Sequence, residues 1–224
     1  MLAVVLFDVD GTLITVAGAG RAALDAAVSE VTGVAGSLAG VAIAGRTDHA
    51  IISDALANAN VSAEDHAAVF RGVTEAYARH LPGHVASAEG AVLPGVAALL
   101  AAMDADAIAS TLATGNLRVG AQIKLHHFGL WRLGFEAGGF GDDSPVRADV
   151  VRAAMLAHAR REHAKFVVIG DTPHDITAAH AAGARAVAVA TGTFTSEELR
   201  VAGADVVFSN LAETSSVLDA ILSG

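Results

Sequence analysis

Short apolar runs rich in β-branched residues alternate with helical patterns along most of this 224-residue chain. Such alternation predicts an α/β fold, in which helices cover both faces of a doubly wound parallel sheet. The predicted strands are Val4–Phe7, Ala107–Ala113, Gly134–Ala137, Phe166–Ile169, Ala186–Ala190 and Asp205–Phe208. The predicted helices of this layer are Pro94–Met103, Arg118–Phe128, Arg147–Arg161, Pro173–Ala182, Ser196–Ala202 and Leu211–Leu222.

One long segment breaks this alternation, between the first and second predicted strands. It contains three helical patterns, Arg21–Val31, Asp48–Ala59 and Ala63–His80, and we predict no strand within it. We therefore expect residues 15–92 to form an inserted helical cap subdomain. Residues 1–14 and 93–224 would then form the α/β core.

Composition excludes several classes of function. The chain has no cysteine, which excludes disulfides, thiolate chemistry and cysteine-based zinc sites. The net charge is −10 and no basic run occurs, which argues against nucleic acid as a partner. No apolar stretch reaches the length of a membrane span, and no basic segment precedes the first apolar run. We expect a cytoplasmic protein with no membrane partner, of undetermined oligomeric state.

Polar side chains stand where several of the predicted strands end. Asp8 and Asp10 follow the first strand, Thr114 follows the second, and Asp171 follows a later one, with Asp175 four residues further on. In a parallel sheet the carboxyl ends of neighbouring strands meet at one crevice, so these side chains should share a site. Clustered carboxylates repel one another, which predicts a hard cation such as Mg²⁺ among them.

The motifs "DVDGTL", "LATGN" and "GDTPHDITAAHAAG" occur in this order. They resemble the haloacid dehalogenase superfamily, in particular its phosphoglycolate-phosphatase-like branch with a helical cap, and the likeness extends over essentially the whole chain. The resemblance implies that Asp8 is a nucleophile, Asp10 a general acid/base and Thr114 a phosphate ligand. Gly115 and Asn116 beside Thr114 are expected to bind substrate. The expected Mg²⁺ ligands are Asp8, Asp10 (through its main-chain carbonyl), Asp171 and Asp175.

The function implied is that of a Mg²⁺-dependent phosphatase, which hydrolyses a small phosphorylated metabolite through an aspartyl-phosphate intermediate. Dehalogenases of this fold lack the second acid, so Asp10 favours phosphate chemistry. The cap segment contains no lysine, which excludes the Schiff base used by phosphonate-cleaving relatives. A phosphomutase of the same superfamily and a non-catalytic phosphoacceptor module are the alternatives. Which phosphate ester is the substrate stays open.

Two cations compete for one role in the site. The third motif of the superfamily usually has a lysine before a proline, whereas this chain reads "PVRAD", so Arg147 is the positional match. Arg147 could instead be a surface residue of its helix. Lys124, on the helix after Thr114, is the rival cation and another candidate for substrate binding, or else a solvated helix lysine. Thr114 could alternatively cap that helix.

Substrate specificity is expected to come from the cap closing over the core. The polar cluster in "AGRTDHA" is the best candidate, with Arg46 and Thr47 as substrate-binding residues. The same segment could instead be a helix start, with Thr47 or Asp48 as its N-cap.

Overall fold

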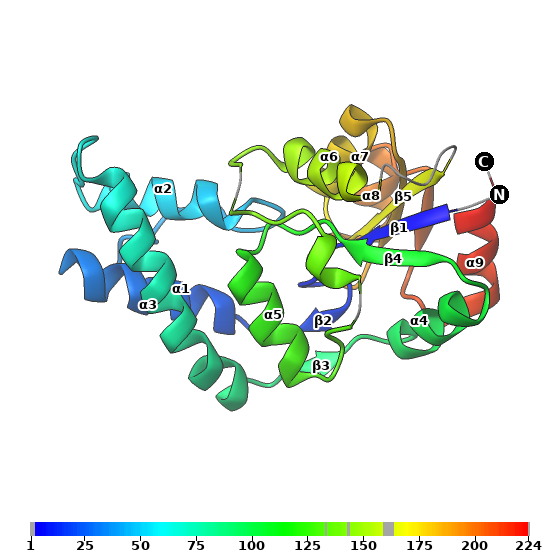
Figure 1. Cartoon of the computed structure of the whole chain (residues 1–224), viewed down its shortest axis with the longest axis horizontal. Coiled ribbons are helices and arrows are strands. Elements are labelled where there is room, and N and C mark those ends of the chain that lie inside the picture. Colours follow the sequence, from blue (N-terminus) through cyan, green and yellow to red (C-terminus); the bar gives the residue numbers. More distant parts are fainter. Residues whose placement is uncertain (1–2, 133, 143, 159–163, 224) are drawn as a thin grey trace.

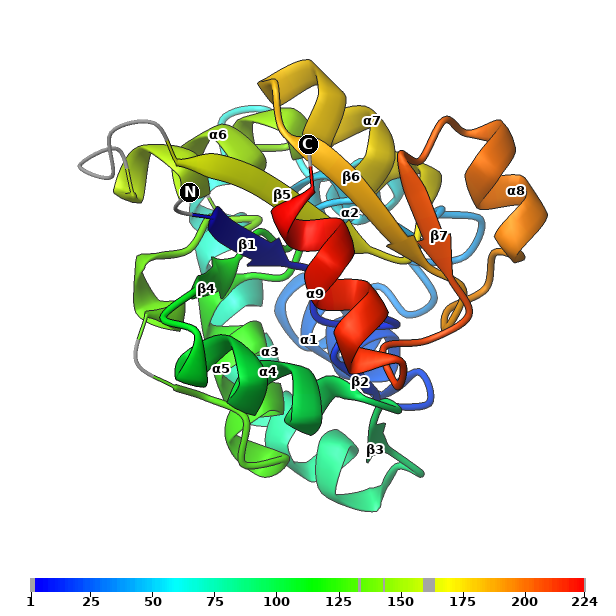
Figure 2. The same ribbon diagram turned by 90° about the vertical axis from the view of Figure 1, so that its right-hand side faces the viewer.

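Five parallel strands form the central sheet of the computed structural model, which describes residues 3–132, 134–142, 144–158 and 164–223. The strands lie in the order β4-β1-β5-β6-β7 (Figures 1 and 2). Strand β1 therefore pairs with β4 on one side and with β5 on the other, and the chain winds in opposite directions from it. Their bounds are β1 Ala3–Phe7, β4 Ala109–Leu112, β5 Lys165–Gly170, β6 Arg185–Val189 and β7 Val206–Phe208. The predicted doubly wound α/β fold is confirmed.

Helices cover both faces of this sheet, because successive side chains of each strand point to opposite faces. In β1, Val5 and Phe7 pack on the face that carries α4 and α9, while Val4 and Leu6 pack on the face that carries α6, α7 and α8 (Figure 1). All of β1 is buried, as expected of a central parallel strand. The core helices are α4 Val96–Ala105, α5 Arg118–His127, α6 Arg147–Ala157, α7 Pro173–Ala182, α8 Ser196–Val201 and α9 Thr214–Leu222.

Three further helices lie between β1 and β4 along the chain, and they stand to one side of the sheet (Figure 1). Their bounds are α1 Ala19–Thr32, α2 Asp48–Asn58 and α3 His66–Ser87, and α1 packs along α3. A short antiparallel pair, β2 Ile14–Thr15 with β3 Ala91–Val92, joins the two ends of this segment. The sequence predicted no strand here, because two residues are too few to show a period. We use the name cap for the segment of residues 15–92, which carries these three helices.

The predicted strand Gly134–Ala137 is wrong. Phe135–Ala137 forms a short 3₁₀ helix instead, preceded by Gly134 at φ = 100°, a left-handed conformation that no strand residue adopts. Phe135 is fully buried, so this apolar residue anchors a turn rather than a strand. In the described part of the following segment, an isolated bridge between Ala113 and Gly139 connects it to the end of β4.

Several element ends differ from those predicted. Helix α3 runs through Pro82 to Ser87, beyond the predicted end at His80, because Leu81 and Val85 are buried and hold the last turns against the core. Helix α6 ends at Ala157 in the described part, and the predicted end at Arg161 lies outside the described residues. Across those residues, no helix is both long and apolar enough to cross a membrane.

Candidate active site

The loop after β1 places two acids at the carboxyl end of the central strand. Asp8 is buried, and its N–H donates to the carbonyl of Ile169 on β5 at 2.9 Å. Val9 is buried in the core, so Asp8 and Asp10 are the two residues of this turn that present carboxylates to the site. Gly11 is left-handed at φ = 81°, and a Cβ there would lie 2.4 Å from Asp171 Oδ2. The loop therefore requires glycine where it passes Asp171.

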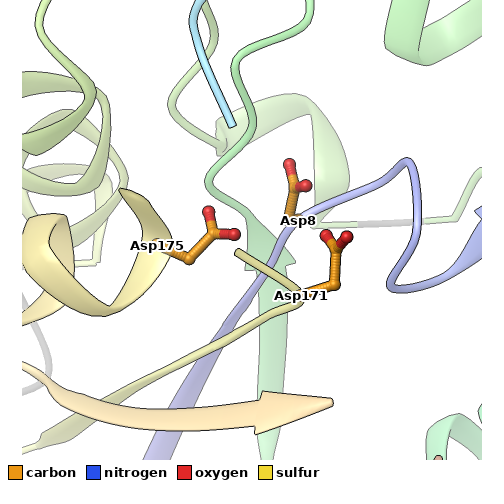
Figure 3. A group of neighbouring side chains, drawn as sticks. All are labelled: Asp8, Asp171 and Asp175. Carbon is orange, nitrogen blue, oxygen red and sulfur yellow. The ribbon is translucent and has the colours of Figure 1, made fainter. Parts of the chain in front are cut away.

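Three buried carboxylates meet at this edge of the sheet (Figure 3). They belong to Asp8 after β1, Asp171 after β5 and Asp175 on α7, and one ligand oxygen from each lies within 4.8 Å of the others. Burial, together with the neighbouring acids, raises the pKa of Asp8 and raises the pKa of Asp171 to about 8. We call these three residues the acidic triad, and its surroundings do not fully compensate its negative charge.

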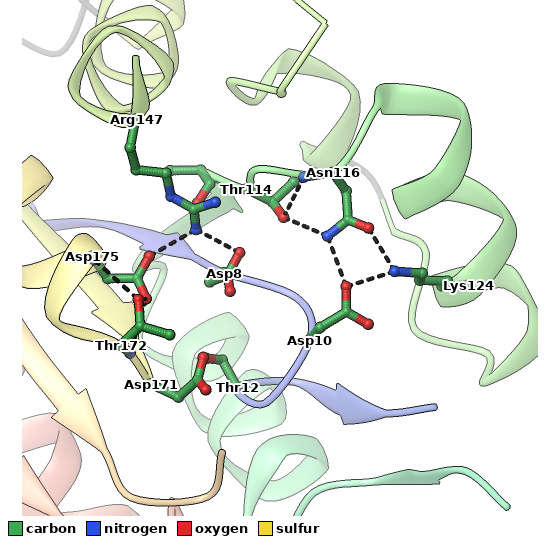
Figure 4. Close-up of polar contacts among 11 residues, drawn as sticks. Asp8, Asp10, Thr12, Thr114, Asn116, Lys124, Arg147, Asp171, Thr172 and Asp175 are labelled. Carbon is green, nitrogen blue, oxygen red and sulfur yellow. Dashed lines mark hydrogen bonds and ion pairs between the residues drawn. The ribbon is translucent and has the colours of Figure 1, made fainter. Parts of the chain in front are cut away.

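Arg147, the first residue of α6, supplies the positive charge in contact with this triad. Its Nη2 lies 2.7 Å from Asp8 Oδ1 and 2.7 Å from Asp175 Oδ1 (Figure 4). The contact with Asp175 is a hydrogen bond, whereas Asp8 Oδ1 is an ion-pair partner that lacks hydrogen-bond geometry. Arg147 is therefore no surface residue; it is buried against the expected nucleophile. A Cβ on Gly115 would lie 2.3 Å from its Nη1, so glycine is needed there too.

Asp175 has donors on both of its oxygens. Oδ1 accepts from Arg147, and Oδ2 accepts from the backbone N–H of Thr172 at 3.1 Å and from its hydroxyl at 2.8 Å. Thr172 and Asp175 form a capping box at the start of α7. Asp171 has a single side-chain donor in the described residues, a 3.4 Å bond from the Thr12 hydroxyl. Of these two acids, Asp171 is the freer to bind a cation.

A second polar network lies beside the triad (Figure 4). Lys124 Nζ donates to Asp10 Oδ2 at 2.6 Å and to Asn116 Oδ1 at 2.6 Å. The Asn116 amide donates to Asp10 Oδ2 at 2.8 Å and to the Thr114 hydroxyl oxygen at 2.9 Å. Thr114 does not cap α5, whose N-cap is Leu117. Each of the two cations thus contacts different acids. Arg147 contacts Asp8 and Asp175, and Lys124 contacts Asp10.

The donor set of the triad fits a hard divalent cation. Three buried carboxylates lie together, and one arginine contacts two of them, Asp8 and Asp175. Burial, together with the neighbouring acids, raises the pKa values of Asp8 and Asp171, and a bound cation would favour their charged forms. Asp8 and Asp171 would hold such an ion, with Asp175 beside them. The side chain of Asp10 points to Lys124 instead, so it could contribute only through its main-chain carbonyl.

A cavity of about 590 Å³ opens above these groups, between the core and the cap. Its floor includes Asp8, Asp10 and Asp171, together with Arg147 and Lys124. The cap contributes mostly apolar surface and a few polar groups. Its lining residues include Val16, Leu24, Ile43, Ile51, Arg46 and Tyr77.

The segment before α2 attaches the cap to the core. Arg46 lines the cavity, but its Nη1 is already paired with Asp54 Oδ2 at 2.7 Å. Thr47 is buried and caps α2 by accepting from the N–H of Ala50 at 3.2 Å, as the helix-start interpretation predicts. Its hydroxyl donates to the carbonyl of Pro145, and it does not line the cavity.

Sequence reasoning gave Asp48 only as part of a polar cluster or as a helix N-cap, and it missed Tyr77. Asp48 Oδ2 accepts from the N–H of Leu117 at 2.8 Å, which joins the cap to the start of α5, and burial raises the pKa of Asp48 to about 6. Tyr77, the single tyrosine of the chain, is buried on α3 and lines the cavity beside Lys124. A lone tyrosine within a helix was the one available signal, and nothing connected it to the acids.

Residues 5–180 match the sequence profile of the haloacid dehalogenase-like hydrolases, and residues 147–214 match a second profile, described as HAD-hydrolase-like. The first match spans most of the 224 residues. The chain therefore belongs to the haloacid dehalogenase-like hydrolase family.

Several known proteins are similar to the chain in sequence or in fold. A probable phosphatase, IndB of Dickeya dadantii, is 28% identical over 144 residues, which are 60% of this chain and 59% of that protein. A predicted phosphatase from Clostridium acetobutylicum has a TM-score of 0.71 at 20% identity, with 98% of this chain and 99% of that chain covered. A variant of CbbY from Rhodobacter sphaeroides, in complex with xylulose-1,5-bisphosphate, has a TM-score of 0.70 at 24% identity, with 95% and 96% covered.

Proposed function

We propose that this chain is a Mg²⁺-dependent phosphatase that hydrolyses a small phosphomonoester through an aspartyl-phosphate on Asp8. The observation that carries the proposal is the position of Asp8. It lies at the floor of the cavity, 2.7 Å from the guanidinium of Arg147 and beside two further acids that could hold a cation. The match of most of the chain to a hydrolase family supports the same reaction class.

Electrostatics decides which groups are needed for attack on a phosphate ester. The ester's oxygens are negatively charged and repel a carboxylate nucleophile, so positive charge must neutralise the phosphoryl group. A divalent ion bound by Asp8 and Asp171 would supply part of that charge when present. Arg147 supplies the rest and holds one oxygen of Asp8, while Oδ2 of the same carboxylate stays available for attack.

Thr114 is the proposed ligand of a phosphate oxygen; it is fully buried and lies behind the lining residues Gly115 and Asn116. Its hydroxyl oxygen accepts from the backbone N–H and the side-chain amide of Asn116, so the hydroxyl hydrogen can donate to a bound phosphate.

Asp10 is placed to transfer protons in both half-reactions. In the first, Asp8 attacks phosphorus, the ester P–O bond breaks, and Asp10 gives its proton to the leaving oxygen. In the second, Asp10 takes a proton from water, and the resulting attack on phosphorus releases phosphate and regenerates the Asp8 carboxylate.

The cavity restricts the proposed substrate to a small molecule. The cap, which we propose to be residues 15–92, covers the site and bonds to the core through Asp48. A cavity of about 590 Å³ holds a metabolite and not a polymer. Arg46 is the proposed contact for the far end of the substrate, although Asp54 already neutralises part of its charge.

The proposed function is tested by assaying the purified chain against a panel of small phosphomonoesters, with Mg²⁺ or with EDTA. Release of phosphate should require Mg²⁺ and should be absent with phosphoproteins and nucleic acids. Turnover that depends on added sugar bisphosphate and yields an isomer, with no free phosphate, would identify a phosphomutase instead. Undiminished turnover in EDTA, on chain shown to be metal-free, would contradict the metal requirement.

Metal binding should weaken as the pH falls. The raised pKa of Asp171, about 8, means that its carboxyl group is partly protonated near neutral pH in the metal-free protein, and Mg²⁺ must displace that proton. An acid with a raised pKa lowers the stability of the metal-free protein as the pH rises from about 4 to about 8. Added Mg²⁺ should therefore raise the thermal midpoint more at pH 8 than at pH 5.5. An equal rise at both values would contradict the placement of the ion at Asp171.

A further inference from the structure

Lys124 is a buried cation that has no contact with the expected nucleophile. It lies on α5, its side chain is 5% exposed, and its two hydrogen-bond partners in the described residues are Asp10 and Asn116. A buried ammonium that makes two bonds of 2.6 Å is held in one position. Among the described residues, its hydrogen bonds are made with groups next to the triad and none with the triad itself.

The cap completes the surroundings of Lys124. A Cβ on Gly20 of α1 would lie 3.2 Å from Nζ, so the cap backbone approaches the lysine closely. Tyr77 of α3 and Asp48 of α2 lie near enough to Lys124 to raise its pKa. The negative charges of Asp10 and Asp48 outweigh the effect of burial and raise the pKa of Lys124, so the group stays protonated.

Asp10, by contrast, is fixed at one of its two oxygens. Oδ2 receives both the Lys124 ammonium and the Asn116 amide, and the same Asn116 amide also donates to the Thr114 hydroxyl (Figure 4). The orientation of the Asp10 carboxylate is thereby tied to the residue proposed to bind phosphate. Without the lysine, the 38%-exposed side chain of Asp10 would keep one neutral donor.

We infer that Lys124 is the positioning residue of the proton-transferring acid. It holds the Asp10 carboxylate in a fixed orientation relative to the bound phosphate. This inference rests on the proposed function of the same site. It separates the two cations by role: Arg147 serves the transfer of the phosphoryl group, and Lys124 serves the transfer of the proton.

The two roles respond differently to the leaving group of the substrate. The parameter kcat/KM reports the steps up to the first irreversible one, here the transfer of phosphate to Asp8. p-Nitrophenyl phosphate releases a weakly basic phenolate that needs little protonation, whereas phenyl phosphate has nearly the same shape and a more basic leaving oxygen. A defect in positioning Asp10 must therefore lower kcat/KM for phenyl phosphate more than for p-nitrophenyl phosphate.

The test is Lys124→Met, assayed with both esters at saturating Mg²⁺. We expect kcat/KM for phenyl phosphate to fall by about 30-fold or more, and that for p-nitrophenyl phosphate by less than about fivefold, within the range of general acid catalysis. Asp10→Asn should show the same selectivity. The double variant Lys124→Met/Asp10→Asn should be little worse than Asp10→Asn alone, because both changes remove one function.

Lys165→Met is the matched control, since Lys165 is the only other lysine of the chain and starts β5, at the opposite end of that strand from Asp171. It should leave both substrates unaffected. If Lys124→Met does not fold by circular dichroism, Gly20→Ala is the second variant. Its methyl group would lie 3.2 Å from Nζ, so the ammonium must move by a few tenths of an ångström, and the ratio should shift in the same direction by a smaller amount. Equal losses on both esters, or additive losses in the double variant, would overturn the inference. A wild-type chain that releases phosphate from neither ester, nor from any member of the panel of small phosphomonoesters, would refute the proposed function itself.

Discussion

Asp8→Asn is expected to lower kcat by at least about 10⁴-fold while leaving the fold intact, since losing a nucleophile costs an enzyme several orders of magnitude. The amide has the shape of the carboxylate but is a poor nucleophile. It also removes one negative charge from the buried triad. The thermal midpoint of the metal-free variant should therefore be no lower than that of the wild type, so a loss of rate could not be attributed to unfolding.

Asp65→Asn is the matched control for this substitution. Asp65 lies exposed in the cap segment, and its carboxylate accepts a hydrogen bond from Ser62 alone among the described residues. The kcat of the Asp65→Asn variant should therefore equal that of the wild type. Mass spectrometry of the Asp8→Asn protein must show that the amide has not hydrolysed back to aspartate. A verified Asp8→Asn protein that retains more than about one per cent of the wild-type rate would exclude Asp8 as the nucleophile.

Arg147→Met should lower kcat by about 10² to 10³-fold, the loss typical of removing one group that stabilises charge in a transition state. A second effect separates this residue from a surface arginine. Without its guanidinium, Asp8 and Asp175 lose a buried partner at 2.7 Å, and breaking such pairs is strongly destabilising. The thermal midpoint in EDTA should fall, and Mg²⁺ should restore part of it.

Arg152→Met provides the comparison on the same helix. Arg152 pairs with Asp149 and donates to the carbonyl of Ala181, both at exposed positions away from the site, so its removal should leave the rate unchanged and lower the midpoint far less than Arg147→Met does. An Arg147→Met protein with wild-type kcat would show that its contact with Asp8 has no part in the reaction.

The acids of the site could be predicted because local sequence rules place them. Asp8, Thr114 and Asp171 each follow an apolar run that forms a buried parallel strand, and such strands bring their carboxyl ends together whatever the details of packing. The same rule correctly grouped Asp10 and Asp175 nearby. It could not tell that Asp175 would also complete a capping box, because that depends on the geometry of one helical turn.

The partners of these acids could not be predicted from the sequence in the same way. Lys124 is 114 positions from Asp10, and Asp48 is 69 from Leu117. These contacts form only when α5 packs beside the loop after β1 and the cap packs against the start of α5. No local pattern encodes such pairs. Arg147 was found by its match to the third motif that the resemblance implies, but its choice over Lys124 as the partner of Asp8 required the fold.

The central claim is that phosphate passes through Asp8, and trapping the phosphoenzyme tests it most directly. Wild-type chain mixed with substrate and Mg²⁺ should be quenched in acid on the millisecond scale, digested and analysed by mass spectrometry. We expect phosphate on Asp8, in the peptide that contains "DVDGTL", formed at least as fast as phosphate is released. Steady turnover with no phosphorylated Asp8 at any quench time, or with the label on another residue, would contradict the account.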